Sequence, residues 1–200
     1  VGSEMCIRDR KWGVITGIRP VKRVNDMLSE GVNKAEIFKA MESRYLCSEE
    51  KCDIAYKTAI TQKPVLDELE KDSFSLYVSV PFCPTRCSYC SFVSQSIEGC
   101  MKLIPEYVNK LCEEIVYTAK ITKKLGLKLD TVYFGGGTPT TLTAAQLDRV
   151  MKVIENSFDM STVREYTVEA GRPDTITEEK LKVLKANGCG LSLIHISEPT

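Results

Sequence analysis

The chain has 200 residues, 43% of them hydrophobic, and its 27 Lys+Arg balance 27 Asp+Glu to give a net charge of zero. A zero net charge argues against nucleic-acid binding that depends on neutralising phosphates. No stretch approaches the ~18–20 apolar residues of a membrane span. Nine cysteines without a secretory signal pattern indicate the reducing cytoplasm rather than a disulfide scaffold.

Both ends of the chain resemble translated sequencing-adapter DNA, over residues 1–10 and 193–200. Non-native ends are left out of fold reasoning. We therefore expect a non-native tail at each end and a natural protein that continues beyond both. The alternative is that these are genuine termini.

Residues 11–72 predict a helical domain. A turn at residues 16–20 precedes a first helix, Asn33 can cap a second one, and Ser48 opens a third. Pro64 is expected to kink the third helix or to restart it.

From residue 73 onward, expected strands alternate with expected helices, which predicts a parallel sheet with crossover helices. Strands are expected at residues 75–80, 130–134 and 165–170, and near Cys189. Helices are expected over residues 104–124, after Thr143 with a capping-box partner at Gln146, and after Thr177.

Three cysteines, Cys83, Cys87 and Cys90, follow the first expected strand with the spacing C-x3-C-x2-C. An all-cysteine four-iron cluster takes four thiolates, so three leave one iron open for an exchangeable ligand, as in sites that carry out chemistry. The alternatives are a zinc knuckle or buried free thiols, but structural zinc prefers four protein ligands. Four further cysteines lack ligand-like spacing and are expected to be small core residues: Cys47, Cys52, Cys100 and Cys112.

Two more motifs follow later strands, Gly-Gly-Gly-Thr-Pro-Thr at residues 135–140 and Glu169 with Gly171-Arg172-Pro173 after it. In a parallel β/α barrel the carboxyl ends of the strands meet on one rim, so the three motifs should converge there. The glycines let backbone approach a ligand, although a tight turn is the alternative. Glu169 can bind an ammonium group, although a strand-end carboxylate is more often simply exposed.

The cysteine spacing resembles the signature of the radical S-adenosylmethionine (SAM) enzymes. Longer stretches resemble the oxygen-independent coproporphyrinogen III oxidase family within that superfamily, and the upstream segment resembles its HemZ-type branch, the coproporphyrinogen dehydrogenases. The stretches that carry these resemblances are residues 77–83, 134–140 and 168–173 for the family, and 11–13 with 16–20 for the branch.

This resemblance implies an α/β fold, in which an N-terminal helical segment (11–72) precedes the first part of a partial parallel (β/α)6 radical SAM barrel (73–192) that is truncated near strand four. It implies a [4Fe–4S] cluster on the three motif cysteines, Cys83, Cys87 and Cys90. It also implies SAM contacts from a set of six residues: Tyr77, Tyr89, Gly136, Gly137, Thr138 and Glu169. From the residues alone, a strand tyrosine such as Tyr77 is usually a core residue.

The activity implied by the resemblance is oxidative decarboxylation of coproporphyrinogen III propionates to vinyl groups in heme biosynthesis, giving protoporphyrinogen IX. A 5′-deoxyadenosyl radical would remove a propionate β-hydrogen, with electrons from a donor such as flavodoxin or ferredoxin. Two positions depart from the best-defined oxidases, which carry a cysteine where Phe92 stands and a histidine where Ser79 stands.

Phe92 is shared with heme chaperones of the same superfamily, so a heme-binding or heme-delivery protein is the alternative function. The helical segment before residue 72 favours the dehydrogenase branch, because the chaperones lack a large leading domain. A zinc-stabilised structural module is a third hypothesis. We expect the chain by itself to be catalytically inactive.

Overall fold

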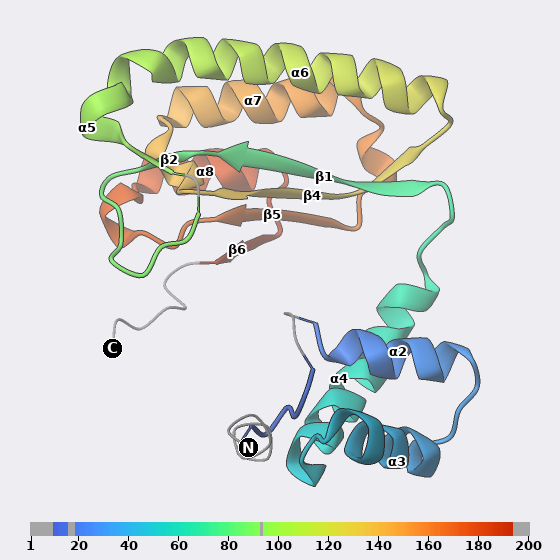
Figure 1. Ribbon diagram of the computed structural model, residues 1–200. Helices are drawn as coiled ribbons and strands as arrows, with labels where there is room; N and C mark the ends of the chain where they lie inside the picture. Colours follow the sequence, from blue (N-terminus) through green and yellow to red (C-terminus); the bar gives the residue numbers. More distant parts are fainter. Residues whose placement is uncertain (1–9, 16–18, 93, 194–200) are drawn as a thin grey trace. The chain divides into compact units, whose positions relative to one another are not determined.

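The computed structural model describes residues 10–15, 19–92 and 94–193. The expected tails therefore lie outside the described residues except for Arg10 and Leu193, as do residues 16–18 of the expected turn. The chain divides into two compact units at the boundary between Glu70 and Lys71 (Figure 1). None of the described helices is long and apolar enough to cross a membrane.

Among its described residues, the first unit has three helices: α2 (Val21–Ser29), α3 (Lys34–Tyr45) and α4 (Glu49–Asp67). The side chain of Asn33 accepts a hydrogen bond from the Glu36 N–H, and that of Ser48 accepts one from the Lys51 N–H, so both expected N-caps are present. The helices enclose a small core of buried side chains: Val24, Ile37, Met41, Cys47, Cys52, Ala55 and Ala59.

Pro64 does not restart the third helix, because α4 runs unbroken from Glu49 to Asp67. Proline removes the N–H that would bond the carbonyl of Ile60, one turn earlier. Ile60 is exposed, so a water molecule can donate a hydrogen bond to its carbonyl in place of the missing N–H. The helix therefore tolerates a proline that a buried helix would not.

The second unit is built on a parallel sheet in the order β1-β4-β5-β6. Its strands are β1 (Ser73–Val80), β4 (Lys128–Gly136), β5 (Glu165–Glu169) and β6 (Leu191–Leu193). The crossover helices are α6 (Ile104–Lys124), α7 (Ala144–Ser157) and α8 (Glu178–Ala186). The order of strand, helix and strand confirms the predicted α/β class.

The sheet has one apolar face and one polar face. Val78, Val132, Phe134 and Val168 are buried in the core with apolar residues of α6 and α7, and Figure 1 shows these two helices lying side by side over the sheet. Strand residues alternate between faces, so the opposite face carries polar side chains. In register on that face are Tyr77, Tyr133 and Thr167.

Short elements that the sequence did not predict connect β1 to α6. They are β2 (Phe82–Cys83), β3 (Gln95–Ser96), α5 (Ile97–Cys100) and the 3-10 turn η1 (Met101–Leu103). Strands β2 and β3 pair in parallel and so hold together the two ends of the cysteine loop. Three further 3-10 turns lie after the other strands and helices: η2 (Pro139–Thr141), η3 (Met160–Thr162) and η4 (Pro173–Thr175).

Candidate functional site

The three sequence motifs line one cavity of about 410 Å³ at the carboxyl ends of β1, β4 and β5. All the residues expected to bind the cluster or SAM are among its lining except Tyr77. The lining residues from those motifs are Cys83, Cys87, Tyr89, Cys90, Gly136, Gly137, Thr138 and Glu169. Their roles in binding stay predictions.

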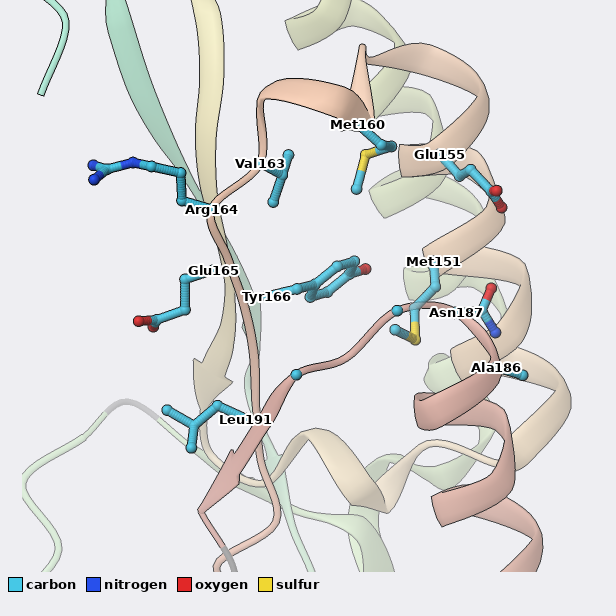
Figure 2. Close-up of a pocket in the computed structure, with 12 residues that line it drawn as sticks. Met151, Glu155, Met160, Val163, Arg164, Glu165, Tyr166, Ala186, Asn187 and Leu191 are labelled. Atoms are coloured by element: carbon cyan, nitrogen blue, oxygen red, sulfur yellow. The ribbon is translucent and has the colours of Figure 1, made fainter. Parts of the chain in front are cut away.

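A larger cavity of about 560 Å³ lies elsewhere and contains none of these residues. Figure 2 shows it near the amino end of β5, where Tyr166 projects toward Met151 of α7. Only the smaller cavity combines thiols, a glycine loop and a carboxylate, so we take it as the candidate site.

The cysteine loop leaves its three thiols half-buried and free of disulfides. Cys83 stands on β2 with its Sγ 3.3 Å from the Thr138 hydroxyl, and the Cys90 N–H donates to the Cys87 carbonyl across a tight turn. The other cysteines that were expected to be core residues, Cys47, Cys52, Cys100 and Cys112, are all buried.

The thiols share a cavity without converging on one point. Within the described ranges, no three Cys, His, Asp or Glu side chains are gathered as ligands of a single metal ion. A zinc ion needs its thiolates within about 2.3 Å of one centre, whereas each cysteine of a four-iron cluster binds a different iron. A four-iron cluster therefore does not require the three sulfurs to share one centre, as a zinc ion does.

The glycine loop is pressed against the cysteine loop so closely that a side chain would not fit. A Cβ on Gly137 would lie 2.7 Å from the Phe82 carbonyl oxygen and 2.9 Å from the Cys83 sulfur. The N–H of Gly137 donates to Val80 and that of Thr138 to Phe82. Both of these N–H groups are already used, so the carbonyl oxygens of these residues and the Thr138 hydroxyl are what they can offer a ligand. This cradle beside a thiol fits a cofactor anchored on Cys83.

Gly136 owes its place in this loop to its backbone conformation. Its φ of +107° lies in a region that residues with a side chain rarely adopt. This φ turns the chain at the end of β4 and brings Gly137 against β2.

Glu169 is held by a tyrosine that the sequence analysis did not select. The Tyr133 hydroxyl donates to Glu169 Oε1 at 2.5 Å, and the Tyr77 ring stacks on the Tyr133 ring with centroids 5.9 Å apart. Burial, and then the bond to Glu169, raise the pKa of Tyr133 to about 12, so its hydroxyl stays a donor at neutral pH. The period of two along β4 puts Tyr133 on the face opposite the buried Val132 and Phe134, and the register of β1 and β4 pairs it with Tyr77.

Tyr77 thus lies on the polar face of the sheet, outside the cavity lining and 58% exposed. It is not a core residue, and burial followed by the charge of Glu169 raises its pKa. Tyr89 is 76% exposed in the cysteine loop, where its ring is available to a ligand.

Arg172 belongs to the predicted motif that follows β5, but no role was predicted for it. Its Nε and Nη2 bond both oxygens of Asp174, at 3.1 and 2.7 Å. Its Nη1 reaches the cysteine loop, 3.2 Å from the Thr85 hydroxyl and 3.9 Å from the Cys87 sulfur. Arg172 therefore links the loop after β5 to the loop after β1.

Comparison with known proteins gives a consistent picture. The family model described as "Radical SAM superfamily" matches residues 77–197. The chain is 40% identical over 178 residues to the oxygen-independent coproporphyrinogen-III oxidase-like protein HemZ of Bacillus subtilis, covering 88% of this chain and 36% of that protein. It is 40% identical over 118 residues to the heme chaperone HemW of the same species, covering 57% and 29%.

A solved structure of coproporphyrinogen III oxidase (HemN) from Escherichia coli, described as a radical SAM enzyme, matches with a TM-score of 0.54 at 31% identity. The match covers 62% of this chain and 28% of that one. The chain thus spans about a third or less of the length of these relatives.

Proposed function

Because this chain belongs to the radical SAM superfamily, whose cofactors are a [4Fe–4S] cluster and SAM, we propose that the cavity at the carboxyl ends of β1, β4 and β5 binds both. The observation that carries the proposal is that three separate motifs line one cavity. When bound, these cofactors supply one-electron chemistry that breaks an unactivated C–H bond, and the protein orients them.

In this proposal the three motif cysteines hold the cluster, and the close approach of Gly137 to Cys83 fixes the first of them. Glu169 accepts a charge-assisted hydrogen bond from the ammonium group of SAM. Tyr133 keeps one oxygen of that carboxylate in place, which leaves the other oxygen for the ligand. The exposed ring of Tyr89 stacks on the adenine.

For the whole protein we propose oxidative decarboxylation of coproporphyrinogen III propionates to vinyl groups, in the cytoplasm, with electrons from a flavodoxin or ferredoxin. The extent of the match to HemZ supports this over the chaperone. An alignment over 178 residues necessarily includes much of the first unit, whereas the match to HemW covers 118. We also propose residues 11–72 as a helical domain and 73–192 as the barrel part, a division that lies close to the boundary between the two compact units.

The cofactor proposal is tested by anaerobic reconstitution. The expected result is bound iron and sulfide, with an electron paramagnetic resonance (EPR) signal that changes when SAM is added. Cys87→Ala should abolish cluster uptake, whereas Cys189→Ala, which removes a half-buried thiol outside the cavity, should leave it intact. Bound zinc without iron or sulfide would reject the proposal in favour of a zinc module.

The reaction is tested with the full-length protein, dithionite, SAM and coproporphyrinogen III under argon. Protoporphyrinogen IX and cleaved SAM are the expected products. The alternative is heme binding and delivery, which is favoured by Phe92, a 64% exposed ring in the cavity lining. Tight heme binding without any turnover would decide for that alternative.

A further inference from the structure

We propose that Arg172 sets the reduction potential of the cluster by donating a charge-assisted hydrogen bond to the sulfur of Cys87. The inference rests on the proposed cluster and is independent of the porphyrinogen substrate. In this role Arg172 does more than hold a cofactor in place, because it controls how readily the cluster accepts its first electron.

The geometry directs one edge of the guanidinium at the cysteine loop. Nε and Nη2 bind Asp174 in the bidentate manner typical of arginine and carboxylate. That pairing fixes the plane of the group and leaves Nη1 toward Thr85 and the Cys87 sulfur. A lysine, with a single ammonium group, cannot hold both contacts in this fixed arrangement.

The surroundings make the positive charge effective. The Arg172 side chain is 26% exposed, whereas that of Asp174 is 52% exposed. The charge of Asp174 is therefore screened by water more than that of Arg172. The pair presents its positive end to the cysteine loop and its negative end away from it.

One-electron reduction adds one negative charge to a cluster and leaves its thiolate ligands in place. Hydrogen bonds to the sulfurs and nearby charge are among the factors that set cluster potentials. A positive donor at Cys87 stabilises the more negative, reduced state, so it raises the potential. Removing the donor should make the cluster harder to reduce.

The test is an EPR-monitored redox titration of the reconstituted full-length protein, with dithionite as the electron donor and no SAM. In Arg172→Gln, the ratio of reduced to oxidised cluster at the wild-type midpoint should fall about tenfold, which is 59 mV for one electron. Arg172→Lys keeps the charge and should give a smaller shift in the same direction. It also serves as the test if the glutamine variant fails to take up a cluster.

Two control variants separate this role from simpler ones. Thr85→Val removes the other contact of Nη1 but keeps the guanidinium, so the potential should not change. Arg86→Gln removes an equal charge from the same loop, where no described contact joins that side chain to a cysteine sulfur, and should shift the potential less than Arg172→Gln. Iron and sulfide content is measured for each variant.

The inference is overturned if Arg172→Gln, or Arg172→Lys in its place, keeps the wild-type potential. It is also overturned if Thr85→Val or Arg86→Gln shifts the potential as much as Arg172→Gln does. A wild-type protein that takes up no cluster rejects the proposed cofactors and the inference together. If the cluster forms normally but its reduction potential does not depend on Arg172, only the inference is rejected.

Discussion

At the scale of single residues, two glycines of the candidate site differ in what surrounds them. A Cβ on Gly137 would collide with the Phe82 carbonyl and the Cys83 sulfur, whereas one on Gly171 would have no atom within 4 Å. We therefore expect Gly137→Ala to displace Cys83 and to lose most of the bound iron and sulfide, with an overpacking cost of about 1–3 kcal/mol. Gly171→Ala, in the same cavity lining, is the matched control and should bind a full cluster.

Iron and sulfide per chain after anaerobic reconstitution measure both variants. Equal cluster content in Gly137→Ala and the wild type would show that the loop moves readily enough to accommodate a methyl group. The close approach in the structure would then have no bearing on the cofactor.

Tyr133 provides the second residue-scale prediction, because its hydroxyl bonds the carboxylate that we assign to SAM. Tyr133→Phe removes that bond and keeps the ring stacked on Tyr77. A hydrogen bond worth about 1 kcal/mol corresponds to a roughly fivefold weaker binding of SAM, measured by titrating the EPR change of the reconstituted protein. Tyr117→Phe, at an exposed position of α6, should bind SAM as the wild type does.

At the scale of elements, an ion pair joins Asp130 of β4 to Arg164, the residue just before β5. Arg164 Nε and Nη2 bond the two oxygens of Asp130 at 2.6 and 3.0 Å, and the Arg164 N–H donates to the Asp130 carbonyl. Asp130 has a 10% exposed side chain and Arg164 a 33% exposed one. Allowing for that solvent screening, Asp130→Asn should lower the free energy of unfolding by about 1 kcal/mol at neutral pH.

The same pair predicts a dependence on pH. The hydrogen bond from Arg164 holds the pKa of Asp130 below its ordinary value. The unfolded chain therefore binds the proton first as pH falls, and the stability from this pair is present above a pH of about 4 and is lost below it. Urea unfolding at a series of acidic pH values should show a shallower loss for Asp130→Asn. Parallel curves for variant and wild type would contradict the assignment.

The regular elements could be predicted because their signals are local. The expected helix over residues 104–124 coincides with α6, and the capping box of Thr143 and Gln146 is present at the start of α7. The β2–β3 pair could not be predicted, since two-residue strands have no periodicity and their pairing depends on where the cysteine loop closes. The restart expected at Pro64 was wrong, because propensity does not tell how exposed a helix will be.

The residues of the candidate site also fall into two groups, those whose part in the site could be predicted from the sequence and those for which it could not. The motif residues could be selected because their types and spacing are unusual in sequence. The roles of Tyr133 and Arg172 could not be predicted, since each acts through a contact with a residue far along the chain, Glu169 and Cys87 respectively. The period of two indicates the face on which Tyr133 lies, and Arg172 stands in a predicted motif, but neither signal identifies the partner of the side chain.

At the scale of the whole molecule, each of the two units has a hydrophobic core of its own. All residues that we assign to cofactors belong to the second unit, whereas Trp12, the only tryptophan of the chain, packs against the core of the first. Tryptophan fluorescence therefore reports unfolding of the first unit, and cluster absorbance reports unfolding of the second.

Two matched substitutions test whether these cores are energetically separate. Met41 in α3 and Met151 in α7 are 0% and 1% exposed, and replacing a buried methionine by alanine costs about 2–5 kcal/mol. Met41→Ala should shift the fluorescence transition in urea to lower concentration and leave the absorbance transition unchanged, while Met151→Ala should do the reverse. If either substitution moves both transitions together, the units unfold cooperatively. The first unit would then stabilise the cofactor site through the fold as a whole.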